Sequence, residues 1–343
     1  MTTADSICRI FSASLCAYGV DTKDGVKGMA LAPDVGFTDA PVATFTAGLR
    51  DIDACYVADT DDSVILAFRG TSTPEDGSTF ISWLNNFLAQ PVSVEDIPGK
   101  LHKGFSNSVQ RLWEEGFQTE VEKRMASGKP LVITGFSKGG ALTPIAATFL
   151  TQKLNIDPSR ITICLFEPPR PGDEVFVKFF NTLFPKAVRY EYKDSIIGHT
   201  PPDDSRLQLL ADLPEAGPIL QILDQIYDYN YKSVGNLKFV NWDDEIVEGS
   251  PALTVTRLEH LMEVMESGEW KKFWTDHLPQ DHLYPIICGK EFPDGEFPPK
   301  NDNESTAPPT RQSEYPNVIN SLLTFMRILR FDSIIKSIRR FSK

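Results

Sequence analysis

The segment at residues 131–140 constrains the fold of this chain more than any other feature of its sequence. Leu131–Thr134 is a short apolar run rich in β-branched residues, which indicates a buried strand. Gly135-Phe136-Ser137-Lys138-Gly139 follows at once, and Ala141–Leu150 then has the apolar pattern of a helix. Glycines two residues before and after a serine let a sharp strand-to-helix turn close and leave the serine hydroxyl exposed above the sheet. This context predicts a nucleophilic Ser137. A phosphate-binding loop requires a different spacing of glycine, lysine and serine or threonine.

Other strands and helices alternate along the chain. Ala54–Asp59 and Ser63–Phe68 form a predicted hairpin, and further buried strands are predicted over Ile161–Phe166 and Val188–Tyr192. Helices are predicted over residues 6–18, 109–124, 174–183 and 255–273. This alternation predicts an α/β fold with a mostly parallel central sheet and helices on both faces. We expect one domain over residues 1–290, a linker rich in Pro, Asp, Glu and Asn over 291–316, and a helical tail over 317–343.

Composition limits the classes of partner. The 343 residues carry a net charge of −13, so nucleic acid is not an expected partner of the body. The five cysteines are scattered without metal or disulfide-framework spacing, and Cys164 and Cys288 lie in apolar runs that predict core thiols. We therefore expect a reducing, cytoplasmic location and no metal or other cofactor. No run is apolar enough to span a membrane, and Met1–Val20 is interpreted as a helix rather than a signal peptide.

The tail at residues 317–343 differs in charge from the rest. It interleaves apolar residues with six basic side chains against Asp332, so it carries about +5 and the remainder about −18. A basic amphipathic helix of this kind is typical of peripheral contact with an anionic membrane surface. The same pattern also fits a helix that docks its apolar face on the acidic body, and the sequence leaves both open.

A serine nucleophile needs an acid that orients its base. Asp194 directly follows the predicted strand Val188–Tyr192 and its Lys193, and strand ends on one edge of a parallel sheet lie side by side. Asp173 and Asp203 do not directly follow a strand. Asp194 is therefore the predicted acid.

The choice of base lies among five histidines. His102 precedes the serine, His199 is too close to Asp194 in sequence, and His260 fits the apolar stripe of a helix. The remaining candidates are His277 and His282, in a predicted loop before a final helix.

Several further segments carry a resemblance to one family. Phe68-Arg69-Gly70-Thr71, His102-Lys103-Gly104-Phe105, the elbow at 135–140, the strand end at 166–172 and Lys193–Pro202 together resemble the fungal lipase-like class 3 lipases of the α/β-hydrolase superfamily. Thr79–Phe87, with Trp83, falls where this family carries its lid.

The resemblance implies a role for each matching residue. Ser137 is the implied nucleophile, Asp194 the acid and His277 the base, because its Asp-His followed by Tyr284 matches the family better than His282 does. Thr71 and the backbone amide of Lys138 are the implied oxyanion hole. Three features depart from the family pattern: Phe136 in place of a histidine, Glu167 where glycine is common, and a long acidic insertion after Pro202.

The implied activity is that of a serine carboxylic-ester hydrolase of the lipase type (EC 3.1.1), acting on acylglycerol-like lipids through an acyl-enzyme. Two alternatives remain open on the sequence: a phospholipase or other esterase, and a catalytically inactive hydrolase fold used for signalling or binding.

Overall fold

The computed structural model describes residues 3–38, 42–71, 90–201, 230–267, 269, 272–293 and 297–299. The predicted lid at 79–87, most of the insertion at 207–231 and the tail at 317–343 lie outside these ranges. The division into a body, a linker and a tail therefore stays a prediction.

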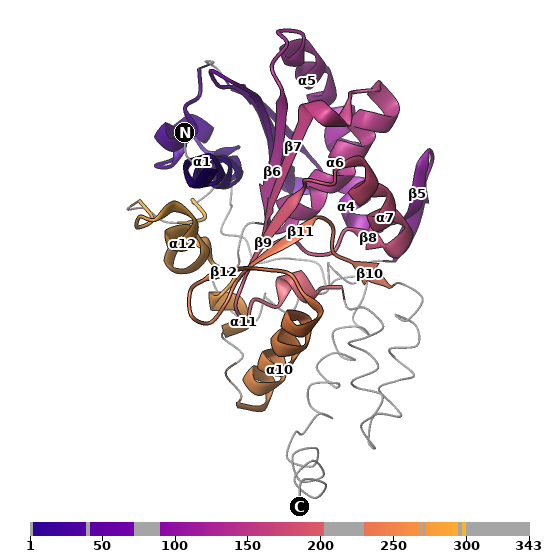
Figure 1. Cartoon of the computed structure of the whole chain (residues 1–343). Helices are drawn as coiled ribbons and strands as arrows, with labels where there is room; N and C mark the ends of the chain where they lie inside the picture. The colour runs from indigo at the N-terminus through magenta and orange to yellow at the C-terminus, as the bar shows by residue number, and fades with distance from the viewer. Residues whose placement is uncertain are drawn as a thin grey trace, which may run out of the picture.

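The centre of the molecule is a sheet of eight strands in the order β1-β2-β3-β6-β7-β9-β11-β12 (Figure 1). The strands from β3 to β11 in this order pair in parallel, and antiparallel strands close both ends. This confirms the predicted mostly parallel sheet. The bounds are β1 (Ala43–Ala47), β2 (Asp53–Asp59), β3 (Val64–Phe68), β6 (Leu131–Phe136), β7 (Ile161–Phe166), β9 (Val188–Tyr192), β11 (Asn236–Val240) and β12 (Ile246–Glu248).

A smaller antiparallel sheet of four strands lies beside the central one, in the order β10-β8-β5-β4. Its strands are β4 (Pro91–Val94), β5 (Ile97–His102), β8 (Gly172–Asp173) and β10 (Tyr231–Lys232).

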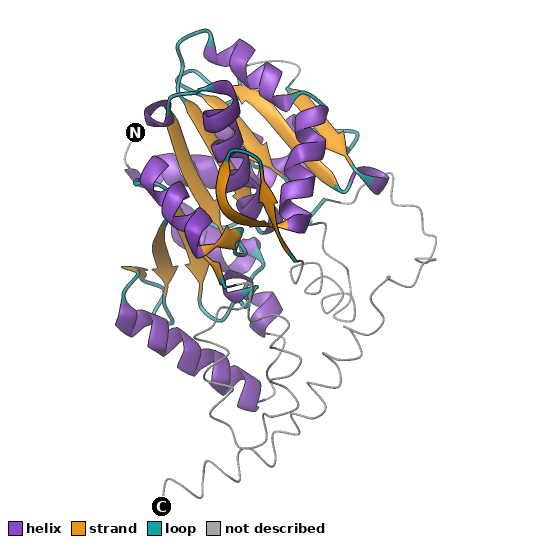
Figure 2. Ribbon diagram, turned by 90° about the vertical axis from the view of Figure 1, so that its right-hand side faces the viewer, coloured by secondary structure: helices purple, strands orange, loops and turns teal. Residues whose placement is uncertain are grey.

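Helices cover both faces of the central sheet (Figures 1 and 2). An apolar core lies on each face of the sheet. Successive side chains of a strand point to opposite faces, so Cys55 and Val57 of β2 pack into one core and Tyr56 packs into the other. One face carries α1 (Thr3–Cys16), α2 (Ala32–Val35) and α12 (Tyr284–Cys288), and the other carries α4 (Lys103–Glu114), α5 (Phe117–Met125), α6 (Lys138–Leu154) and α7 (Glu174–Leu183). Two further helices, α10 (Pro251–Ser267) and α11 (Lys272–Thr275), lie near the carboxyl end of the sheet.

Two predicted helices are interrupted. The helix expected over 109–124 is divided between α4 and α5 at Gly116, whose φ of 96° breaks the helical backbone. The helix expected over 255–273 is divided between α10 and α11. Among the described residues, no helix is long and apolar enough to cross a membrane.

The cysteine prediction is half wrong. Cys164 is a buried free thiol, as expected, but Cys288 forms a disulfide with Cys8 across a sequence separation of 280 residues. Spacing along the chain gave no signal of this pair, because the two cysteines meet only where α1 and α12 pack together on one face of the sheet. The bond weighs against the expected reducing compartment.

Candidate active site

The turn between β6 and α6 holds Ser137 in a strained conformation. Its φ of 56° and ψ of −128° lie outside the common regions for a residue with a side chain. The flanking glycines are needed for close packing: a Cβ at Gly135 would lie 2.2 Å from the carbonyl carbon of Gly139, and one at Gly139 would lie 2.1 Å from the oxygen of Phe68. The predicted strand–elbow–helix is therefore confirmed, and glycine is required on both sides of the serine.

His277 meets this serine from far along the chain. Its Nε2 lies 2.9 Å from the Oγ of Ser137, and both side chains are almost fully buried. His277 lies in the loop after α11, as the sequence predicts. The other candidate, His282, instead packs its ring beside Tyr192, with 5.2 Å between the ring centroids. The structure thus brings His277 to Ser137.

An apolar setting keeps the imidazole neutral. The ring of Phe136 stacks on His277 with 5.0 Å between centroids and an interplanar angle of 22°. Burial lowers the pKa of His277 to about 3, so the neutral form that can accept a proton is the stable one at neutral pH. Phe136, one of the departures from the family pattern, thus forms part of the desolvated wall around the base.

Two polar groups face the other ring nitrogen of His277. The Oε2 of Glu167 lies 3.5 Å from Nδ1, and the Oγ of Ser195 lies 3.4 Å from it. Glu167 directly follows β7 and Ser195 lies just after β9, so neighbouring parallel strands deliver both side chains to the same edge.

The predicted acid, Asp194, has a different partner. Its Oδ1 accepts a hydrogen bond of 3.0 Å from the indole Nε1 of Trp242, and its backbone amide donates to the carboxylate of Asp276 at 3.2 Å. Asp276 directly precedes His277, so Asp194 lies near the base. The carboxylate that faces the imidazole nitrogen is nevertheless that of Glu167.

The oxyanion residues lie around the start of α6. The amide of Lys138 is at the N-terminus of this helix, where free backbone N–H groups and the helix dipole favour negative charge. Thr71 follows the end of β3, and a Cβ at its neighbour Gly70 would lie 2.8 Å from the oxygen of Phe136, so this strand end packs against the elbow. Both residues are therefore in the region the prediction requires, and their role as oxyanion donors stays a prediction.

The side chain of Lys138 turns away into a buried ion pair. Its Nζ lies 2.6 Å from the Oδ1 of Asp53, whose other oxygen accepts 2.8 Å from the Nε of Arg111. Burial raises the pKa of Asp53, but the neighbouring ammonium and its hydrogen bond outweigh that effect and the pKa falls below its usual value. Burial lowers the pKa of Lys138 despite the same carboxylate. The pair fixes the first residue of α6 to the start of β2.

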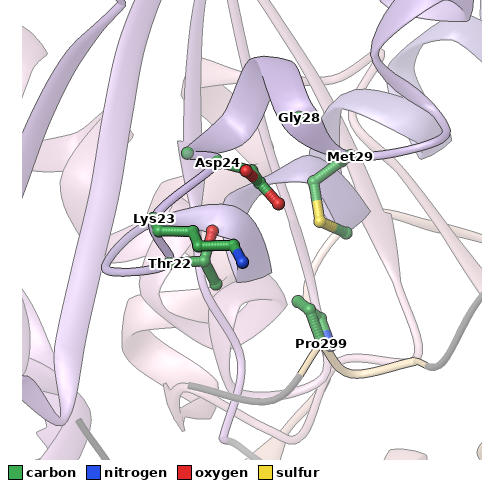
Figure 3. A pocket seen from close by; sticks show the side chains of 7 residues that line it. Thr22, Lys23, Asp24, Gly28, Met29 and Pro299 are labelled. Atoms are coloured by element: carbon green, nitrogen blue, oxygen red, sulfur yellow. The ribbon is translucent and has the colours of Figure 1, made fainter. Parts of the chain in front are cut away.

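A small cavity lies elsewhere in the molecule and is not lined by Ser137, His277 or Glu167. It lies between the loop at residues 22–29 and Pro299, with Lys23, Asp24 and Met29 among its lining (Figure 3). Within the described ranges, His, Cys, Asp and Glu side chains form no cluster that could hold a metal ion.

Comparison with known proteins finds similarity to lipases in sequence and in fold. Residues 65–205 match the family model for lipase (class 3). This match covers less than half of the chain and shows a similarity to class 3 lipases over that part. A secreted mono- and diacylglycerol lipase of Fusarium solani is 24% identical over 180 residues, which are 50% of this chain and 49% of that protein. The chain thus spans about half the length of this curated relative.

Solved lipases have a fold similar to that of this chain. Lipase II from Rhizopus niveus superposes with a TM-score of 0.54 at 19% identity, over 69% of this chain and 80% of that one. A triacylglycerol lipase described as having a serine protease triad superposes with a TM-score of 0.53 at 18% identity, over 68% and 79%. The predicted α/β-hydrolase fold is confirmed.

Sequence reasoning missed Glu167 and Ser195 as neighbours of the base. The rule that selected Asp194, an acidic residue at the end of a strand in the parallel sheet, applies equally to Glu167 after β7. That signal was present in the sequence, whereas Ser195 and Trp242 carried none.

Proposed function

We propose that this chain is a serine carboxylic-ester hydrolase that acts on acylglycerol lipids. The observation that carries the proposal is the 2.9 Å contact between the Oγ of Ser137, raised on a strained elbow, and the Nε2 of a buried neutral His277. This pairing of hydroxyl and imidazole is what activates a serine as a nucleophile. The similarity to mono- and diacylglycerol and triacylglycerol lipases supports the substrate class.

The mechanism follows from these groups. Ser137 Oγ attacks the ester carbonyl while His277 Nε2 takes its proton, and the proton then passes to the leaving alcohol. The amide of Lys138 and the hydroxyl of Thr71 stabilise the tetrahedral oxyanion, each donor lowering the barrier by about 3 kcal/mol. Water activated by the same imidazole then cleaves the acyl-enzyme. The residues named supply every proton transfer that these steps need.

A matched pair of variants tests the proposal. With p-nitrophenyl esters and emulsified mono-, di- and triacylglycerols, we expect Ser137→Ala to lose about four to six orders of magnitude in kcat. The control is Ser127→Ala, which removes a serine hydroxyl from an exposed turn and should retain full activity. A fluorophosphonate probe should label the wild type and the Ser127 variant but leave the Ser137 variant unlabelled.

Two alternatives have distinct outcomes when phospholipids are added to the substrates of these assays. Hydrolysis of phospholipids in preference to acylglycerols would identify a phospholipase. A wild-type protein that neither hydrolyses any ester nor accepts the probe would refute the proposal and leave a hydrolase fold used for binding.

Contact with a membrane surface is proposed for the basic tail at 317–343, which lies outside the described residues. Six basic side chains among apolar ones are the observation in its favour. Pelleting with anionic liposomes should require residues 317–343, and equal pelleting of the full and truncated chains would contradict this. The cytoplasmic location stays a prediction, against which the Cys8–Cys288 disulfide weighs.

A further inference from the structure

The side chain of Glu167 is held in one place by its surroundings. It is completely buried, and its Oε1 accepts a hydrogen bond from the backbone amide of Tyr192 on the adjacent strand. Its own amide donates to the oxygen of Tyr190 at 2.8 Å, which extends the pairing of β7 with β9 by one residue. With one carboxylate oxygen occupied by the backbone, Oε2 is left facing Nδ1 of His277 at 3.5 Å.

The backbone at this residue is strained. Glu167 has a φ of +50°, in the left-handed region that is unfavourable for a residue with a Cβ. Such a conformation is unfavourable and persists where the surrounding structure fixes it, often at a functional site. Ser137 is strained in the same way, at φ +56°, at the end of the neighbouring strand. The two strained residues lie on either side of the same imidazole ring.

Asp194 is committed to a second network. Trp242 donates to its carboxylate, and the indole of Trp242 stacks on the ring of His260 with 3.5 Å between centroids and an interplanar angle of 13°. His260 belongs to α10, so this network connects the end of β9 to the turn between β11 and β12 and to that helix. Its geometry fits a structural role for Asp194.

We propose that Glu167, rather than Asp194, is the acid that positions His277. The inference rests on the proposed function, because it concerns the base of that reaction. Nδ1 carries its hydrogen toward Oε2 of Glu167, which directs the lone pair of Nε2 at Ser137. When Nε2 takes the serine proton, the carboxylate stabilises the imidazolium, and the hydrogen on Nδ1 stays where it is. Ser195, whose hydroxyl hydrogen-bonds Glu167, closes the same side of the ring.

The contact of 3.5 Å is long for a hydrogen bond. A hydrogen bond to a catalytic base tightens as charge develops on the base during the reaction. The attraction that develops is strong here, because the imidazolium forms in an almost fully buried position beside the fully buried carboxylate of Glu167.

The charges around Glu167 set how the pair titrates. Burial raises the pKa of Glu167 well above its usual range, the negative charge of Glu191 adds to this, and Arg257 opposes it. Glu191 is itself paired with Arg189 and Arg257. Asp276, adjacent to the base, has its pKa raised by burial and by Asp194. The mechanism uses the carboxylate form of Glu167, which the hydrogen bonds from Ser195 and the amide of Tyr192 and the charge of Arg257 favour. Because Glu167 and His277 are in contact, the two groups titrate as one coupled unit, and its acid limb is seen in the pH profile of kcat/KM.

The experiment compares Glu167→Gln with Asp194→Asn in the full chain, with Glu167→Asp as a partial rescue. We expect Glu167→Gln to lower kcat by about three to four orders of magnitude with little change in KM, because the amide can hold either tautomer of the ring. The acid limb of the pH profile of kcat/KM should shift or disappear in Glu167→Gln. Loss of a purely structural group would not change this pH profile. Glu167→Asp should recover part of kcat, and Asp194→Asn should lose less than about tenfold.

A second measurement is independent of turnover. The proton on Nδ1 of His277 should give a low-field NMR signal in Ser137→Ala protein, lost when Glu167→Gln is added and retained when Asp194→Asn is added. A collapse of kcat in Asp194→Asn with an active Glu167→Gln overturns the inference, as does a low-field signal that depends on Asp194. A wild type without esterase activity refutes the proposed function instead, and the NMR comparison still decides the partner of His277.

Discussion

The disulfide between Cys8 and Cys288 gives the most quantitative prediction. It connects α1 near the start of the chain to α12, the last described helix, and so closes a loop of 280 residues. In the chain-entropy model, a crosslink over such a loop removes unfolded-state freedom worth about 5 to 6 kcal/mol at 25 °C. Measured losses on removing a native disulfide are about 2 to 5 kcal/mol. We therefore expect Cys8→Ser with Cys288→Ser to lower the free energy of unfolding by about 3 kcal/mol or more.

Packing at the crosslink limits the loss. The ring of Phe11 in α1 lies 5.9 Å from that of Tyr284 in α12, so the two helices remain in contact without the bond. For a domain of this size, 1 kcal/mol corresponds to roughly 2 °C in Tm, and the double variant should melt roughly 5 to 10 °C lower.

Guanidinium and thermal unfolding, each with and without dithiothreitol, measure this effect. Reductant should lower the stability of the wild type to that of the double variant and leave the variant unchanged. Mass spectrometry of protein alkylated in denaturant without reductant should show three free thiols in the wild type, those of the buried Cys16, Cys55 and Cys164. Equal stability of the wild type and the double variant, or five alkylated thiols in freshly purified protein, would refute the reasoning.

Two further predictions concern the elbow. Asp53→Asn leaves the buried ammonium of Lys138 without its anion and should destabilise the protein by about 3 to 5 kcal/mol in urea unfolding; a loss below about 1 kcal/mol would contradict the buried pair. Gly139→Ala places a Cβ 2.1 Å from the carbonyl oxygen of Phe68, a backbone atom that cannot move aside, and should cost about 1 to 3 kcal/mol or more together with most of the esterase activity. Gly140→Ala meets its neighbours only at 3.0 Å and is the matched control, with a smaller loss on both measures.

The elements that depend on local signals could be predicted from the sequence. The bounds of α7 and β9 were predicted to the residue, since the cap of α7 is local: the side chain of Asp173 accepts a hydrogen bond from the amide of Phe176. The division at Gly116 was missed because a single glycine within an apolar helical pattern is compatible with a continuous helix until its φ is known.

The disulfide and the partner of the base could not be predicted in the same way, and for one physical reason. Each depends on contacts between residues far apart in sequence: 280 residues for Cys8 and Cys288, and 110 for Glu167 and His277. Asp194 and Glu167 both follow parallel strands of the sheet, so strand order alone cannot decide between them.

Which of the two carboxylates, Asp194 or Glu167, faces His277 depends on the other hydrogen-bond donors within reach of each. The indole of Trp242, 48 residues beyond Asp194, offers that carboxylate a donor. The amide of Tyr192 binds Oε1 of Glu167, and Oε2 faces Nδ1 of His277. A buried carboxylate oxygen without a donor is costly, so each oxygen is directed to the nearest available N–H. If this reasoning is correct, Trp242→Phe removes the donor that holds Asp194. The triple comparison of Trp242→Phe, Glu167→Gln and the double variant should then show partial recovery of kcat in the double variant, as the released Asp194 becomes free to turn toward the ring. A double variant no more active than Glu167→Gln would mean that the position of Asp194 is fixed by its backbone and not by the indole.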